Sequence, residues 1–187
     1  VGKSGTSTSA IIFGGSAPPS IATTNIYSVG GIGDTIKNEG QVYYNSTTNL
    51  LKLTATVYGT GAWASGGNLN VAKQAGSLGA DTNAAATYAG GTNPSGTLAT
   101  TELYNGTAWT VSPQTLNASR QYPGTIGSST SMLVVTGLTG SPTAITVNVE
   151  EWNGSNWTEK ANVNTGRYEG IGGSGTSTSG MIFGGKE

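Results

Sequence analysis

The chain has 187 residues, a length that suits one all-β domain or a few units of a repeat protein. Gly, Thr, Ser and Asn fill 95 positions, while eight basic and nine acidic residues leave a net charge of −1. The small charge argues against disorder, a nucleic-acid-binding surface and a polybasic membrane patch. The chain has no Cys and no His, which excludes disulfides and thiol chemistry and removes the usual general base. This composition disfavours most enzymes, and no apolar stretch is long enough for a membrane helix.

Read from the N-terminus, the chain offers short apolar runs that predict β-strands. The first two runs are residues 9–13 and 22–28. The letters GQVYYNSTTNLLKL contain predicted strands at 41–44 and 50–53, which flank a polar turn. This hairpin lies within a segment, 34–62, that we interpret as an insertion in the first repeat unit.

The second half of the chain continues the pattern. Predicted strands lie at 131–135, at 144–152, where polar and β-branched residues alternate, and at 179–183. The Asn-Gly pairs that begin at Asn105 and Asn153 predict two-residue hairpin turns, because both central residues of such turns need a positive φ. No window shows the 3.6-residue periodicity of an amphipathic helix. The sequence therefore predicts an all-β fold.

The same sequence elements recur along the chain with a step of 46–48 residues. NLNVAK, TLNASR and NVNTGR begin at positions 68, 115 and 162, and TELYNGTAWT, from position 101, matches VEEWNGSNWT, from position 149. Trp63 lies 46 residues before Trp109 and extends the second series. Residues 2–15 and 172–185 are identical at 11 of 14 positions. A repeat of this length predicts β-propeller blades of about four short strands each.

The repeat divides the chain into about three and a half units. After a lengthened first unit come complete units at about 68–114 and 115–161 and a partial unit at 162–187. A closed propeller needs at least four blades. We therefore expect the chain to be part of a larger propeller, completed by more of the same polypeptide, or a set of blades shared with neighbouring subunits.

The order of residues within the units resembles kelch repeats. A double Gly follows an apolar strand, as at Gly14, and an aromatic residue, a Trp and a basic residue occur in turn, as in Tyr104, Trp109 and Arg120. The spacing between the aromatic residue and the Trp is shorter than in most kelch repeats, which indicates a variant subfamily. The repeats are similar to those in kelch-like structural proteins of tailed phages, especially phages that infect cyanobacteria. We interpret residues 1–187 as one such kelch-like region.

The GQVYYNSTTNLLKL hairpin, followed by Trp63, resembles a hairpin that recurs in tail-fibre and appendage proteins of phages. Together the two resemblances imply a virion structural protein, most simply a tail fibre, spike or other appendage that presents loops to a glycan or protein of the host surface. They also imply homo- or hetero-oligomeric assembly with other virion subunits. The alternative is a capsid or tail decoration protein with a purely structural role. A glycan-acting enzyme is disfavoured, because the sequence offers no plausible pair of catalytic carboxylates.

Residues that recur once per unit are expected to be structural. The aromatic residues predicted to pack between blades are Trp63, Tyr104, Trp109, Trp152 and Trp157. Glu102 and Glu150 are predicted to be polar edge residues near Lys or Arg, not a catalytic pair. The basic residues that recur once per unit are Lys73, Arg120 and Arg167. We expect them to form a ladder that bonds loop carbonyls and these glutamates. The alternative is a positive ring that binds anionic polysaccharide.

The candidates for receptor contact are aromatic residues predicted to lie exposed on loops: Tyr88, Tyr122 and Tyr168. The two aspartates, Asp34 and Asp81, match no calcium-binding loop, and a calcium site built from backbone carbonyls is left open. No catalytic, cofactor-binding or metal-binding residue is assigned from the sequence. No cofactor, nucleic acid or membrane insertion is expected.

Overall fold

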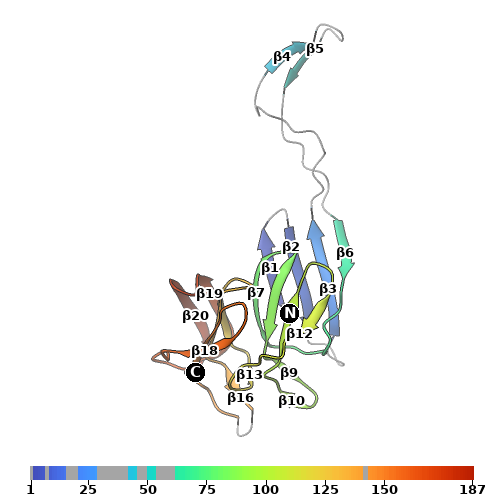
Figure 1. Cartoon of the computed structure of the whole chain (residues 1–187). Coiled ribbons are helices and arrows are strands. Elements are labelled where there is room, and N and C mark those ends of the chain that lie inside the picture. Colours follow the sequence, from blue (N-terminus) through green and yellow to red (C-terminus); the bar gives the residue numbers. More distant parts are fainter. Residues whose placement is uncertain are drawn as a thin grey trace.

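The computed structural model describes residues 2–6, 9–15, 21–28, 42–45, 50–53, 62–140 and 143–187 (Figure 1). The regular elements in these residues are all β-strands, and every pair of strands is antiparallel. The predicted all-β class is confirmed. Within the described ranges, no helix has the length and apolar composition needed to cross a membrane.

Within the described residues, three sheets have four strands each, and in each of them the strands are joined in chain order. The first sheet contains β1 (Gly2–Thr6), β2 (Ser9–Gly15), β3 (Ile21–Ser28) and β6 (Ala62–Gly66). The second contains β7 (Ser77–Thr82), β8 (Ala85–Ala89), β11 (Thr101–Tyr104) and β12 (Trp109–Val111). The third contains β14 (Gly124–Gly127), β15 (Met132–Val135), β17 (Val149–Trp152) and β18 (Trp157–Lys160).

The part of the chain that the structure describes also contains four sheets of two strands each. They are β4 (Val42–Asn45) with β5 (Leu50–Leu53), β9 (Thr92–Asn93) with β10 (Gly96–Thr97), β13 (Arg120–Gln121) with β16 (Leu138–Thr139), and β19 (Tyr168–Gly175) with β20 (Gly180–Lys186). We call the last pair the C-terminal hairpin. The predicted hairpin around residues 41–53 is confirmed as β4 and β5, and Figure 1 draws it apart from the other sheets.

The first strands of successive sheets lie side by side, β1 next to β7, β7 next to β14 and β14 next to β19. The segments that link one sheet to the next therefore gather at one end of these strands, which we call the linker end. The small hairpin β9–β10 and the pair β13–β16 lie at this end, at the bottom of Figure 1. The opposite end, the turn end, carries the turns between the first and second strands.

Among the side chains that the structure describes, the buried apolar ones form three clusters between the sheets. One contains Leu69, Ala86, Tyr88, Tyr104 and Trp109 on one face of the second sheet. The next contains Ala89, Leu116, Met132, Val134 and Trp152, between the second and third sheets. The last contains Ile126, Val135 and Val149, with Ile182 of the C-terminal hairpin packed against them. Apolar residues thus face both sides of the third sheet, because a sheet enclosed by two neighbours buries both faces.

The N-terminal and C-terminal hairpins have the same register, as the sequence predicts. In the first hairpin Gly2 pairs with Phe13 and Ser4 pairs with Ile11. In the second, Gly172 pairs with Phe183 and the pairs continue in the same order down to Gly175 with Gly180. Residues 2–15 and 172–185 therefore occupy equivalent strands of two different sheets.

Two details of the predicted strands and turns are wrong. The strand predicted at 144–152 is limited to β17, because Thr146 and Ala144 bond back to the loop after β15 and turn the chain away. The Asn-Gly turns have four residues rather than two. Asn105 does not adopt a positive φ; instead its side-chain oxygen accepts N–H bonds from Thr107 and Ala108, at 3.0 and 2.9 Å. An Asn side chain that replaces a backbone acceptor in this way is an Asx-turn.

Candidate functional site

Two repeat-equivalent ion pairs are buried between linkers and sheets. Lys73 and Arg120 lie on the linkers that precede the second and third sheets, and Glu102 and Glu150 lie on the third strand of each. The Lys73 ammonium is 2.9 Å from Glu102, and the Arg120 guanidinium contacts Glu150. All four side chains are at least 98% buried. The predicted proximity to Lys or Arg is confirmed, but the predicted edge position is wrong, because a linker covers each carboxylate.

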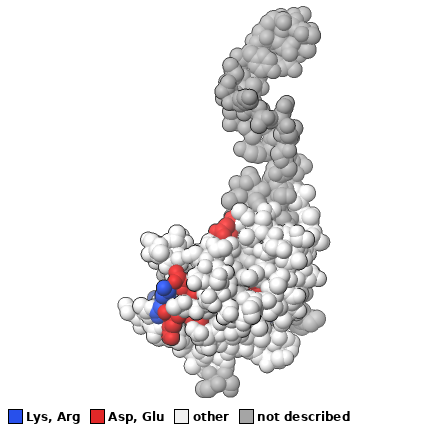
Figure 2. All heavy atoms as spheres, viewed as in Figure 1, with Lys and Arg blue, Asp and Glu red and all other residues white. Residues whose placement is uncertain are grey.

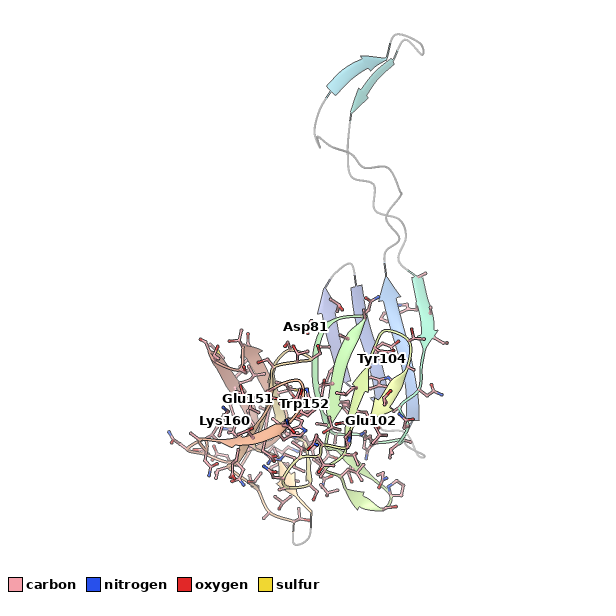
Figure 3. The ribbon with its side chains drawn as sticks, viewed as in Figure 1. Asp81, Glu102, Tyr104, Glu151, Trp152 and Lys160 are labelled. Atoms are coloured by element: carbon pink, nitrogen blue, oxygen red, sulfur yellow. The ribbon has the colours of Figure 1, made fainter. Side chains whose placement is uncertain are left out.

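The second oxygen of each carboxylate is bound in the same way in both sheets. Glu102 Oε2 accepts the Asn70 backbone N–H at 2.7 Å, and Glu150 Oε2 accepts the Asn117 backbone N–H at 2.7 Å. Asn70 also donates its side-chain N–H to Glu102, at 3.0 Å. Figure 3 shows Glu102 toward the linker end, away from Asp81. A carboxylate that accepts this many bonds has little free capacity, so these groups hold the linkers in place.

The two cations differ in their remaining contacts. Lys73 donates to Thr100 Oγ1 at 3.1 Å and lies 5.2 Å from the centre of the Tyr88 ring. Arg120 donates to the carbonyl oxygens of Asn148 and Thr136, at 2.9 and 3.4 Å. Burial lowers the pKa of Lys73 from its ordinary value, and the charge of Glu102 opposes that shift.

The third basic residue, Arg167, repeats part of this arrangement. Its guanidinium donates to the carbonyl oxygen of Gly184 at 3.1 Å, and Gly184 is the repeat equivalent of Thr136. Of the predicted ladder, Arg120 bonds both loop carbonyls and its glutamate, Lys73 bonds its glutamate, and Arg167 bonds a loop carbonyl. Because the two Lys/Arg–Glu pairs are enclosed, they offer no exposed positive ring for an anionic polysaccharide.

The recurring tryptophans each stand opposite an aromatic residue on the neighbouring strand. The pairs are Tyr27 with Trp63, Tyr104 with Trp109, and Trp152 with Trp157. The predicted packing role holds for Trp109, which is 5% exposed, and for the aromatic residues of the third sheet. It is wrong for Trp63, which is 55% exposed. Tyr27 is not recognisable from the repeat spacing, because 36 residues separate it from Trp63 instead of the five between Tyr104 and Trp109.

Tyr88, predicted to be an exposed loop residue, is 2% exposed and belongs to β8. Its hydroxyl oxygen accepts the Gly76 N–H at 3.0 Å, and burial raises its pKa to about 12. The signal that could have found this is the alternation in the segment from Ala85 to Ala89, which puts Tyr88 on the same face as Ala86. Tyr122 and Tyr168 are half-buried at the linker end.

Three residues with positive φ form a repeated backbone contact at the linker end. Ala75, Tyr122 and Glu169 have φ of 57°, 55° and 51° and lie 47 residues apart. The Tyr122 N–H donates to Ala75 at 2.7 Å, and the Glu169 N–H donates to Tyr122 at 3.2 Å. We call these residues the linker ring. Such backbone costs about 1–3 kcal/mol per residue and is often found at functional sites. This backbone conformation is not predictable from the residue types, because none of the three is Gly.

The loop of the β9–β10 hairpin and the loop after β16 also lie at the linker end. Pro94, Ser95 and Gly96 are exposed on the β9–β10 hairpin, and Thr143 and Ala144 are exposed in the loop after β16. The face of the molecule seen in Figure 2 is largely uncharged, apart from acidic and basic atoms clustered at its lower left. The linker end can therefore offer hydrogen-bonding groups and tyrosine rings to a partner, beside the exposed ion pair of Lys186 with Glu169.

The turn end contains a polar pocket of about 440 Å³ between successive first-strand turns. Its lining includes Asp81, Ser128, Ser131 and Ser177, and the hydroxyls of Ser131 and Ser177 are 2.6 Å apart. Asp81 accepts the backbone N–H and the hydroxyl of Ser129, at 3.1 and 2.6 Å. Asp34 lies outside the described residues. In the parts of the chain that the structure describes, no three His, Cys, Asp or Glu side chains converge.

Comparisons with known proteins add no family. A scan against models of known protein families finds no match, and a search among curated proteins finds none either.

Proposed function

We propose that the sheets are kelch-like β-propeller blades. The support is the succession of four-stranded antiparallel sheets whose first strands lie side by side. In a propeller the first strands of the blades surround a central axis, and the blades pack face to face. The buried network of Asn, Glu and Lys or Arg recurs at the linkers before the second and third sheets and would fix the angle between blades.

We further propose that the protein is a virion structural protein of a tailed phage, in a tail fibre, spike or other appendage. Its blades would present loops for attachment to the host surface. The resemblance of the repeats and of the GQVYYNSTTNLLKL hairpin to phage proteins supports this role. A rigid, weakly charged β scaffold needs no cofactor for such a task. A decoration protein is the second candidate, favoured by the exposed Met181 and Phe183, which suit contact with another subunit.

The main support for the attachment role is the arrangement of residues at the linker end. Positive-φ residues held by repeated hydrogen bonds fix its loops, and Tyr122 and Tyr168 are partly exposed among them. Tyrosine supplies a large apolar face and a hydroxyl with little loss of conformational entropy on binding. A glycan or a protein loop of the host envelope fits that chemistry. An anionic polymer does not, because the basic residues of the ladder are bonded internally.

A retention assay tests the attachment role. The protein is passed over immobilised envelope polysaccharide and envelope protein from cyanobacteria, and both retention and release of fragments are measured. We expect retention without fragment release, and loss of retention in Tyr168→Ala. Thr178→Ala, at the turn end, is the control and should bind as the wild type does. Equal binding by both variants would contradict the linker-end assignment, and released fragments would favour an enzyme.

A further inference from the structure

The C-terminal hairpin is a two-stranded copy of the first half of the first sheet. Residues 172–185 and 2–15 share 11 of 14 amino acids and pair in the same register. In the first sheet the equivalent hairpin is β1–β2, and its outer strand, β2, pairs with β3. Within the described residues, β20 pairs with β19 alone. The outer edge of β20 therefore has nearly the same sequence as the edge that β3 already binds.

The same hairpin exposes apolar side chains. Met181 is 65% exposed and Phe183 is 55% exposed. Their repeat equivalents in the third sheet are Leu133 and Val135. Val135 belongs to the buried cluster beside the C-terminal hairpin, and Leu133 packs against that cluster. An apolar strand edge without charge or Pro is prone to pair with another chain.

We propose that β20 of one copy of this chain pairs with β3 of a second copy. The C-terminal hairpin would then take the place of β1–β2 in the first sheet of the second copy. The register of β2 with β3 fixes the expected pairs: Phe183 with Thr24, Ile182 with Asn25, and Met181 with Ile26. One strand ladder is exchanged for a nearly identical one, so the exchange loses little pairing: it covers the outer edge of β20 and releases the matching edge of β2.

Pairing of β20 with β3 of the same chain would close a ring of the three four-stranded sheets that the structure describes, which is smaller than the usual range of four to eight blades. Pairing with β3 of a second copy avoids that small ring, and two copies that exchange hairpins would be related by a two-fold axis. The inference rests on the proposed blade arrangement and not on the phage role.

Engineered disulfides test the register directly, because the chain contains no Cys. The double variant Asn25→Cys with Ile182→Cys places the two thiols at directly opposite positions of the new ladder. Mild oxidation should give a cross-linked dimer of twice 18.7 kDa on a non-reducing gel. The control, Asn25→Cys with Met181→Cys, puts the thiols on opposite faces and should stay monomeric. A cross-linked monomer, or equal dimer in both variants, would overturn the proposal.

A matched pair of proline variants tests the exchange without cross-linking. Ile12 and Ile182 are equivalent positions of the two hairpins. Ile12→Pro weakens the chain's own hairpin and should raise the dimer fraction in sedimentation, whereas Ile182→Pro should abolish the dimer, since proline cannot donate to a ladder. Cooperative unfolding of each variant shows that it folds. Monomers throughout, for the wild type and Ile12→Pro alike, would overturn the proposal, and retention on envelope polysaccharide by such monomers would leave the attachment role intact.

Discussion

Trp109 and Trp63 hold the same place in two sheets but lie in different surroundings. Each is opposite a tyrosine on the adjacent strand, Tyr104 or Tyr27. Trp109 is buried, in one cluster with Leu69 of the linker, whereas Trp63 is mostly exposed. The repeated sequence thus specifies the cross-strand pair, and the burial of that pair depends on what packs against the sheet. Local pairing and tertiary burial can therefore be tested separately.

The largest difference is expected between alanine substitutions of these two residues. Trp109→Ala removes a buried aromatic ring and should lower the free energy of unfolding by about 3–5 kcal/mol. Trp63→Ala removes an exposed ring and should cost about 1 kcal/mol or less. Urea denaturation of both variants measures the contrast. Similar losses would mean that Trp63 is buried in solution, for instance by association between copies.

A second contrast compares two adjacent glutamates on β17. Glu150→Ala leaves the buried Arg120 guanidinium without its carboxylate, which should cost about 3–5 kcal/mol of unfolding free energy. Glu151 pairs with Lys160, whose side chain is 46% exposed, and Glu151→Ala should cost about 1 kcal/mol at most. The midpoints of urea denaturation give both values. If the two variants were equally stable, the ion pair of Arg120 would not hold the linker.

The features that the sequence predicts correctly are encoded within one unit or by residues that recur from unit to unit. The strands of the hairpin at 41–53, the register shared by residues 2–15 and 172–185, and the ladder of Lys73, Arg120 and Arg167 follow from local pattern and spacing. Each depends on residues that lie close in the chain or recur at a fixed step. Such patterns do not depend on which other segments pack against the sheet.

The features that the sequence did not predict depend on neighbouring segments. The sequence predicts a loop position for Tyr88, but the linker that covers β8 buries this residue. The sequence predicts an edge position for Glu102, because it does not show that a linker folds back over the carboxylate. The positive φ of Ala75, Tyr122 and Glu169 has no sequence sign, since residues that disfavour this backbone occupy all three positions. At each of these positions, tertiary contacts determine the burial or the backbone conformation of the residue.

A pH titration sharpens the comparison for Tyr88, the residue whose burial the sequence missed. Its pKa is raised to about 12, above the ordinary value of 10.0, because burial disfavours the charged phenolate. The unfolded chain therefore loses this proton first, and stability should fall between about pH 10 and pH 12. A shift of about two pKa units corresponds to about 2.7 kcal/mol.

The wild type and Tyr88→Phe separate this effect from the others. Lys73 has a lowered pKa, so its own contribution to stability rises with pH below 10.5, opposite in sign to that of Tyr88. Lys73 is present in both proteins, so the difference between their unfolding free energies isolates Tyr88. That difference should change steadily above pH 10. Parallel pH profiles would show that Tyr88 titrates normally.

The smallest expected effect concerns the Asn-Gly loops, where the two sheets should behave alike. Asn105 and Asn153 each accept two backbone N–H bonds within a four-residue loop, and neither has a positive φ. A two-residue turn would tolerate glycine at these positions, because glycine adopts positive φ readily. The observed loop instead needs the side-chain oxygen, so Asn105→Gly and Asn153→Gly should each lose about 1 kcal/mol of unfolding free energy. Thermal unfolding compares them with Thr107→Ala, an exposed loop control. Equal losses at the two sites would show that this contact is local, unlike the burial that separates Trp109 from Trp63, and an unchanged melting temperature would restore the two-residue turn.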